Sequence, residues 1–127
     1  MTPKEKQSPT ELSAEEIVLD FINDLNKEDF ESARKRVSDN MSFKGVLGSR
    51  EGGDVYIREM GQMKMKYQLK MVFTSGDDVC VMYDFTQGGK TLPGCGWYHL
   101  EEGKIRMLTV IFDPRPLLED SHLASKN

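Results

Sequence analysis

The chain has few of the residues that build metal centres or disulfide frameworks. Only two of its 127 residues are cysteines and two are histidines. Cys80 and Cys95 form no Cys-x-x-Cys motif, and neither His99 nor His122 lies at metal-ligand spacing from other candidate ligands. A disulfide-dependent secreted fold and a structural zinc site are therefore not indicated. We expect no metal and no other cofactor.

Long apolar runs and clusters of basic residues are also missing. The longest apolar run is far shorter than a membrane span, and residues 1–10 lack the apolar core of a secretory signal. The net charge is −4, and the 17 basic residues are spread along the chain. This pattern argues against nucleic acid and against an anionic membrane surface as partners. We expect a cytoplasmic protein.

The length suits a single domain with a real core. Residues 1–11 are polar and contain Pro3 and Pro9, so we expect a disordered tail there. Residues 119–127 are expected to fray in the same way. The predicted domain therefore covers residues 12–118, with no internal repeat and no second domain.

The first half of the domain has helical patterns. Ser13 and Glu16 form a capping box at the start of a helix. Apolar residues follow at helical spacing and form one stripe, namely Ile17, Val18, Phe21, Ile22 and Leu25. A second, shorter helix is predicted over residues 28–37.

A short strand, a loop and a third helix are predicted next. The strand covers residues 41–47 and the loop covers residues 48–53. Asp54 is the expected N-cap of the third helix, which continues over residues 55–64 with Ile57 and Met60 facing inward.

The second half reads as four strands joined by tight turns. The strands carry the sequences MKYQLKMVF, VCVMYDF, GCGWYHL and KIRMLTVIF, and clusters rich in Gly, Asp or Glu separate them. Such short turns can join only antiparallel neighbours. Helices segregated from strands predict an α+β fold, with the helices packed on one face of an antiparallel sheet.

Alternation along these strands gives two faces, and neither is properly polar. A solvated antiparallel sheet should alternate cleanly between apolar and polar residues. Both faces are therefore expected to be covered. The three helices can cover one face, so we predict a homodimer in which a second copy covers the outer face.

Four stretches carry a resemblance to a known superfamily, and their sequences are FINDLNKEDFESA, SDNMSFKG, GGDVYIREM and WYHLEEGKIRMLTVIFD. In this order and spacing the chain resembles the nuclear transport factor 2-like superfamily over residues 13–113. That superfamily includes the SnoaL-like cyclases and the ketosteroid isomerases. The resemblance implies a curved, cone-shaped antiparallel sheet, the cystatin-like α+β roll, whose open end holds a small apolar ligand.

The resemblance also implies which side chains face that pocket. The predicted wall residues are Cys80, Met82, Asp84, Cys95, Trp97, His99, Leu108, Val110 and Phe112, with Phe43 and Met60 closing the sides.

This chain lacks the residues that perform the best-known chemistries of the superfamily. The positions that match the ketosteroid isomerase base and oxyanion donors fall near Gly45, near Phe21 and at Cys95, and none can do that work. Ketosteroid isomerase activity is therefore not expected. An Asp–Arg–Asp relay of the epoxide hydrolase kind has only Asp84, Arg58 and Arg106 as candidates, and both arginines are expected to face solvent.

Two hypotheses remain. In the first, the chain is an enzyme of the SnoaL type, in which Asp84 performs acid–base chemistry on a carbonyl compound and His99 is a candidate second proton-transfer group. In the second, it is a non-catalytic dimeric module that binds a small apolar molecule or supports a partner.

Overall fold

A computed structural model describes residues 12–118 and has the α+β architecture. The predicted tails at 1–11 and 119–127 lie outside the described residues. The elements, in chain order, are α1 (Ala14–Asn26), α2 (Phe30–Lys35), β1 (Val37–Gly45), β2 (Gly48–Glu51), α3 (Gly53–Met63), β3 (Lys66–Ser75), β4 (Asp78–Gln87), β5 (Lys90–Glu101) and β6 (Lys104–Phe112). None of the helices in this range is long and apolar enough to cross a membrane.

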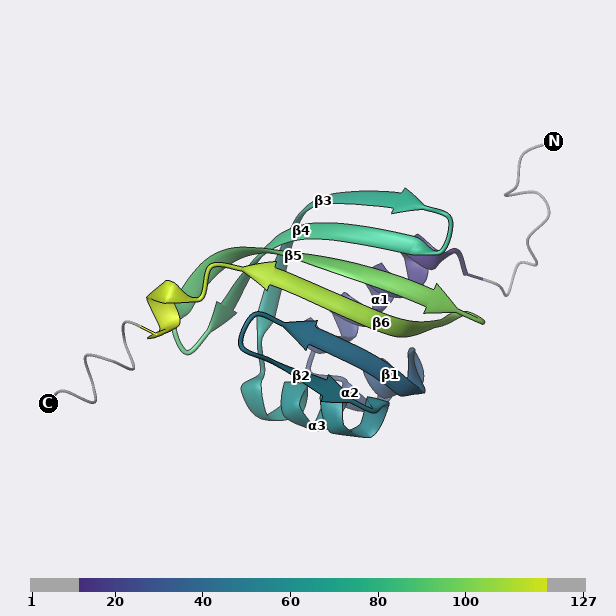
Figure 1. Ribbon diagram of the computed structural model, residues 1–127, viewed down its shortest axis with the longest axis horizontal. Coiled ribbons are helices and arrows are strands. Elements are labelled where there is room, and N and C mark those ends of the chain that lie inside the picture. The colour runs from purple at the N-terminus through teal and green to yellow at the C-terminus, as the bar shows by residue number, and fades with distance from the viewer. Residues whose placement is uncertain (1–11, 119–127) are drawn as a thin grey trace, which may run out of the picture.

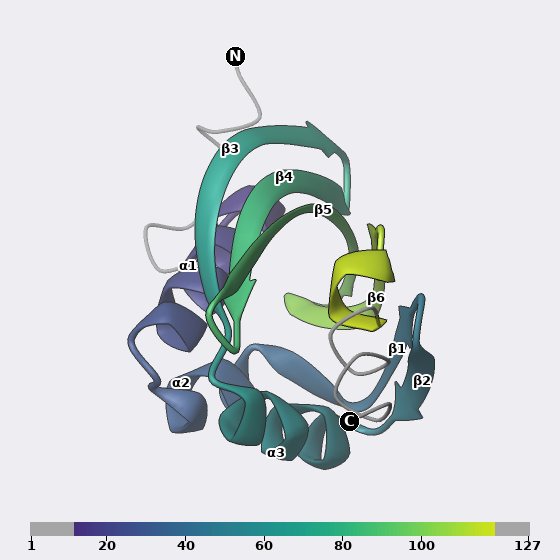
Figure 2. The same ribbon diagram turned by 90° about the vertical axis from the view of Figure 1, so that its left-hand side faces the viewer.

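The six strands form one sheet in the order β2-β1-β6-β5-β4-β3. All neighbours are antiparallel except β1 and β6, which run parallel. The last strand therefore lies in the middle of the sheet, between the first strand and β5 (Figure 1). The sheet is strongly curved: β3, β4 and β5 form an arch, with α1 beside β3 and α3 on the open side of the arch (Figure 2).

The capping box at the start of α1 is confirmed. The Ser13 hydroxyl accepts from the Glu16 amide at 3.1 Å, and the Ser13 amide donates to the Glu16 carboxylate at 2.8 Å. The predicted apolar stripe of this helix is buried against the sheet. Local sequence signals therefore determine both where α1 begins and which side it buries.

Several predicted boundaries in the first half are wrong. The second helix ends at Lys35, and Val37 begins β1 because its side chain is fully buried in the sheet. The predicted loop over 48–53 contains β2, which pairs with β1 as a hairpin. The N-cap of α3 is Gly52, with a φ of 100°, whereas Asp54 lies in the first turn and accepts from Arg34 Nε at 2.6 Å.

A β-bulge at Arg106 determines which side chains face the helices. In the β5–β6 hairpin Leu100 pairs with Ile105, but the next pair is His99 with Met107, so Arg106 is left unpaired. Without the bulge Trp97 would oppose Leu108; with it, Tyr98 does. A shift of one residue transfers a whole strand from one face to the other.

The predicted inner set is therefore divided between the two faces. Leu108, Val110 and Phe112 of β6 lie on the inner face, as predicted. The assignment of the β4 and β5 residues to that face is wrong: Cys80, Met82, Asp84, Cys95, Trp97 and His99 share the outer face. Buried residues take their place on the inner face, namely Val79, Val81, Tyr83, Phe85, Tyr98 and Leu100.

Candidate functional site

A cavity of about 440 Å³ lies between α3, the β1–β2 hairpin and the inner face of the sheet. Of the predicted pocket residues, five line it: Phe43, Met60, Leu108, Val110 and Phe112. Further apolar walls come from residues that were not predicted, among them Val46, Leu47, Met63, Met65, Phe85 and Leu117. The cavity is thus built mainly from apolar and aromatic side chains, as small-molecule sites are.

All four tyrosines of the chain converge on this cavity. Tyr56 comes from α3, Tyr67 from β3, Tyr83 from β4 and Tyr98 from β5. Aromatic contacts hold the rings: Tyr67 packs edge-to-face on Tyr83 with centroids 5.0 Å apart, and Tyr56 stacks on Phe43 at 5.1 Å. Four elements that are separate in the sequence therefore place phenol groups at one point.

The hydroxyl groups of this tyrosine cluster have little to bind within the protein. Tyr67 Oη reaches only the sulfur atoms of Met60 and Met65, at 3.9 and 4.0 Å. Within residues 12–118, the hydroxyls of Tyr56, Tyr83 and Tyr98 have no hydrogen-bond partner, yet no buried polar side-chain atom there is unsatisfied. These three hydroxyls must therefore open into the cavity.

Burial raises the pKa of every tyrosine in the cluster. Desolvation is the first cause in each case, and neighbouring phenols add to the shift for Tyr56, Tyr83 and Tyr98. In every pair of tyrosines in the cluster, one phenol raises the pKa of the other, which agrees with hydroxyls grouped in one small space. The phenols consequently remain neutral and able to donate at any physiological pH.

An ion pair lies at the wall between the β1–β2 hairpin and α3. Arg50 Nε donates to Glu59 Oε2 at 2.7 Å, and Arg50 Nη1 donates to the Ser49 carbonyl at 2.7 Å. Glu59 is the one carboxylate among the described residues that line the cavity, and its charge raises the pKa of Tyr56 further. Gln62 and Gln87 supply the remaining polar side chains.

Asp84, the predicted acid–base residue, lies outside the cavity. It sits on the outer face, where its carboxylate is 3.1 Å from Lys70 Nζ. His99 and Trp97 are engaged elsewhere on that face: His99 Nδ1 is 3.0 Å from Asp78, and Trp97 Nε1 donates to the same carboxylate at 2.8 Å. The predicted proton-transfer groups are thus on the opposite side of the sheet from the five predicted pocket residues that line the cavity.

The positions weighed for other chemistries do not form a relay. Arg58 is exposed on α3, Arg106 is half-buried at the bulge, and neither contacts Asp84. Phe21 is core, whereas Gly45 does line the cavity. Among residues 12–118 no three His, Cys, Asp or Glu side chains gather where they could hold a metal ion.

The tyrosine cluster was not found from the sequence, although part of its signal was present. Alternation correctly grouped Tyr83 with Val81 and Tyr98 with Leu100. The missing information was which face that group occupies. The two glycines of β5 indicate which face it is. Gly94 and Gly96 alternate with Cys95 and Trp97, which are half-buried and exposed, so the glycines lie on the face that has to accommodate large rings.

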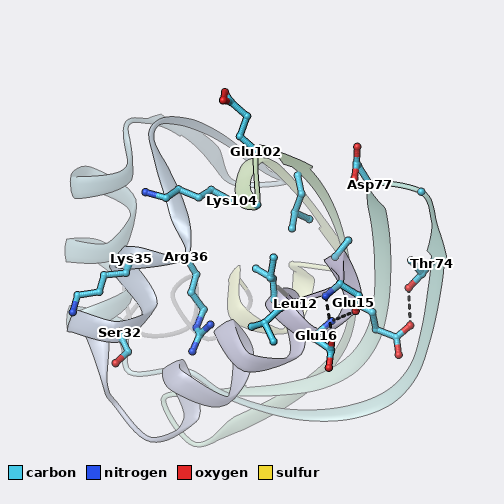
Figure 3. Close-up of a pocket in the computed structure, with 16 residues that line it drawn as sticks. Leu12, Glu15, Glu16, Ser32, Lys35, Arg36, Thr74, Asp77, Glu102 and Lys104 are labelled. Atoms are coloured by element: carbon cyan, nitrogen blue, oxygen red, sulfur yellow. Dashed lines mark hydrogen bonds between the residues drawn. The ribbon is translucent and has the colours of Figure 1, made fainter. Parts of the chain in front are cut away.

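A second depression, of about 1250 Å³, lies at the opposite end of the sheet (Figure 3). The start of α1, the β3–β4 turn and the β5–β6 turn border it. Its labelled charged side chains are spread around the rim and do not converge on one point, and the Glu15–Thr74 hydrogen bond of 2.8 Å lies along one side (Figure 3). The tyrosine-lined cavity, with its convergent donors, is the better candidate site.

Comparison with known proteins agrees with this architecture. The model of the SnoaL-like domain matches residues 18–107. Among solved structures, an NTF2-like protein of unknown function from Cytophaga hutchinsonii is 45% identical, with a TM-score of 0.85, over 87% of this chain and 99% of that one. The search of curated proteins found no match.

More distant structures share the fold alone. A cystatin-fold protein from Novosphingobium aromaticivorans is 16% identical, with a TM-score of 0.72, over 79% of this chain and 98% of that one. An LEH-like epoxide hydrolase from M. tuberculosis is 20% identical, with a TM-score of 0.70, over 84% of this chain and 86% of that one.

Proposed function

The chain belongs to the SnoaL-like domain family of the NTF2-like superfamily, and on that basis we propose that it binds a small apolar molecule carrying a hydrogen-bond-accepting oxygen, such as a ketone. One observation carries the proposal: three tyrosine hydroxyls, those of Tyr56, Tyr83 and Tyr98, open into a mainly apolar cavity without partners among the described residues.

The chemistry of the donors selects the ligand. A hydroxyl removed from water without a partner costs free energy, which a ligand oxygen recovers. Since their raised pKa values keep the phenols protonated, the ligand has to present an acceptor. The aromatic walls at Phe43, Phe85 and Phe112 favour a flat or cyclic apolar body.

Binding is favoured over acid–base catalysis because the expected base is on the wrong side of the sheet. Asp84 pairs with Lys70 on the outer face and cannot reach a ligand held by the tyrosine cluster. Glu59 does line the cavity, but one of its oxygens is already held by Arg50. The site therefore resembles a preorganised binding pocket more than a pair of groups arranged for proton transfer.

A matched pair of ligands tests the proposal. 2-Acetylnaphthalene and 2-isopropenylnaphthalene differ in one position, an oxygen in the first and a CH₂ group in the second. We expect the ketone to raise the melting temperature more than the alkene, because a ligand of the native state stabilises it in proportion to affinity. In Tyr56→Phe, Tyr83→Phe or Tyr98→Phe, whichever removes a donor to the ligand oxygen, the advantage of the ketone should shrink, while alkene binding persists.

Either of two results would contradict this proposal. The first is equal stabilisation by ketone and alkene in the wild type. The second is an advantage for the ketone that survives in Tyr56→Phe, Tyr83→Phe and Tyr98→Phe alike, since the oxygen would then be recognised elsewhere.

We further propose that a second copy of the chain covers the outer face of the sheet. Large apolar side chains from four consecutive strands are exposed there, including Phe73 at 55%, Met82 at 47%, Trp97 at 51% and Ile111 at 63%. They lie in two cross-strand rows, Phe73–Cys80–Trp97–Thr109 and Met71–Met82–Cys95–Ile111. An apolar patch of this kind marks an interaction surface.

The absence of charge in both rows favours a second copy as the occupant. A two-fold contact sets the same patch against itself, and uncharged rows allow that without like-charge repulsion. Trp97 suits the centre of such a contact, because its bond to Asp78 fixes the indole before association.

Sedimentation analysis at micromolar concentration tests the second copy. We expect a dimer for the wild type and a monomer for Met82→Lys and Ile111→Lys. Val55→Lys changes an exposed apolar residue on α3, away from this face, and should leave the dimer intact. A wild-type mass of one chain would refute the proposal.

A further inference from the structure

Two glycines of β5, Gly94 and Gly96, face the helices where other strands carry large side chains. Gly96 pairs with Val81 of β4 and Val110 of β6, and Gly94 pairs with Tyr83 and Phe112. Strand glycines often mark a bend or a place where another group approaches the backbone closely. Here β5 is a strongly curved strand (Figure 2), and aromatic rings lie over both glycines.

The ring of Tyr98 lies over Gly96. A methyl group at Gly96 would be 2.9 Å from Cε1 and 3.3 Å from Oη of Tyr98. The tyrosine side chain therefore leans along its own strand, and its hydroxyl comes to lie above Gly96 rather than above its own backbone. The ring has little room to move away, because Tyr98 is only 2% exposed and contacts Phe21 edge-to-face at 6.3 Å.

Gly94 accommodates a different ring. A methyl group there would be 3.1 Å from Cε1 of Tyr83 and 3.3 Å from Cδ1 of Phe85. Both distances are longer than the 2.9 Å between a methyl group at Gly96 and Cε1 of Tyr98, and neither involves Tyr98. The two glycines thus make room for two different donors of the tyrosine cluster.

We propose that Gly96 is a specificity-determining position, which holds the Tyr98 hydroxyl where it can donate to a ligand oxygen. This inference rests on the proposed function. Any side chain at position 96 displaces the Tyr98 ring and withdraws its donor from the cavity, while the apolar walls remain. Gly96 is a positioning residue, since it acts through Tyr98 and not by touching the ligand oxygen itself.

A double-mutant cycle tests the coupling between the two residues. Dissociation constants for 2-acetylnaphthalene and 2-isopropenylnaphthalene are measured for the wild type, Gly96→Ala, Tyr98→Phe and the double variant. We expect Gly96→Ala and Tyr98→Phe each to lower the ketone-over-alkene preference by about 2- to 10-fold, the range of one hydrogen bond. The double variant should lose no more than either single variant, because both remove the same donor.

Gly61→Ala is the matched control. It makes the same chemical change on α3, where the nearest atom to the new methyl group, in Phe30, is 3.8 Å away. Its ketone-over-alkene preference should equal that of the wild type.

A second readout needs no ligand. The chain has four tyrosines, so tyrosine labelled with ¹³C in the ring gives a spectrum simple enough to assign by Tyr→Phe substitution. Gly96→Ala should shift the Tyr98 signals most, and Gly94→Ala should shift those of Tyr83. Should Gly96→Ala fail to fold, Gly96→Ala/Tyr98→Leu should restore folding by making room for the methyl group.

The outcomes separate the two claims. A wild type without ketone preference defeats the proposed function and, with it, the specificity role. A wild type with the preference, together with a Gly96→Ala variant that keeps it, overturns the role of Gly96 alone. Unmoved Tyr98 signals in Gly96→Ala, or a Gly96→Ala/Tyr98→Leu variant that does not fold, also overturn it.

Discussion

The side-chain amide of Asn26 binds both backbone groups of Tyr67. Asn26 Nδ2 donates to the Tyr67 carbonyl at 2.9 Å, and the Tyr67 amide donates to Asn26 Oδ1 at 2.7 Å. Tyr67 lies on β3, the edge strand of the sheet, so these groups face away from β4. The amide at the end of α1 thus acts as a one-residue strand partner and fixes a cavity tyrosine to the first helix.

Asn26→Ala should lower the free energy of unfolding by about 1 to 3 kcal/mol, because it leaves a partly buried donor and acceptor unsatisfied. Urea denaturation followed by circular dichroism measures the change. Asn23→Ala, on the exposed side of the same helix, should cost much less. Equal losses in the two variants would show that the effect belongs to the helix and not to Tyr67.

The four tyrosines should resist ionisation while the chain is folded. Their folded-state pKa values are raised by burial above the ordinary 10.0. The resulting stabilisation is fully present below about pH 10 and decreases above it, since the unfolded chain then releases phenol protons more readily. Phenolate absorbance should therefore appear together with the loss of circular dichroism. A titration centred at about pH 10 with the dichroism unchanged would contradict this.

Acid should release Trp97 from Asp78 at an unusually low pH. The Trp97 indole N–H and then His99 hold the pKa of Asp78 below its ordinary 3.8. The bond's contribution to stability is thus present above pH 3.8 and is lost as the pH falls through the lower folded value. Trp97 is the single tryptophan, so its fluorescence should change with a midpoint below 3.8. A midpoint at or above that value, or the same curve in Asp78→Asn, would refute the assignment.

Cys95 should react slowly with alkylating reagents. Burial, and then the neighbouring Cys80, raises the pKa of its thiol above the ordinary 9.0. The thiolate is the nucleophile, so the rate should reach its midpoint above pH 9.0. In Cys80→Ala, which leaves one thiol, the midpoint should fall but stay above 9.0, because burial persists. A midpoint at or below 9.0 in Cys80→Ala would contradict the raised pKa.

Local signals in the sequence were sufficient to predict the three helices and five of the six strands, but not β2. Ser13 and Glu16 placed the start of α1, and turn residues separated the four strands of the second half. These features depend on neighbours in the chain, so they can be read without tertiary information. Residues 37–40 show the limit of such signals: they continue the polar pattern after a helix, yet burial of Val37 draws them into β1.

The faces of the sheet could not be predicted in the same way. Alternation grouped the β4 and β5 residues correctly, and Trp97 does share a face with Cys80. Joining that group to β6 required the register of the last hairpin, in which the two-residue turn at Glu102 and Gly103 is followed by a bulge. The bulge at Arg106 has no clear local signal, and it alone reverses the connection to Leu108.

The central place of β6 has a consequence for how the protein is made. Phe43 of β1 pairs with Leu108 of β6, and no other strand separates β1 from β5. As the ribosome releases the chain from its N-terminus, β1 can pair with β2 early but must wait for its other neighbour, β6, until the last strand has emerged. Contacts between such distant segments slow folding, so we expect the nascent chain to pass through a stage in which the cavity is still open on the side that β6 will close.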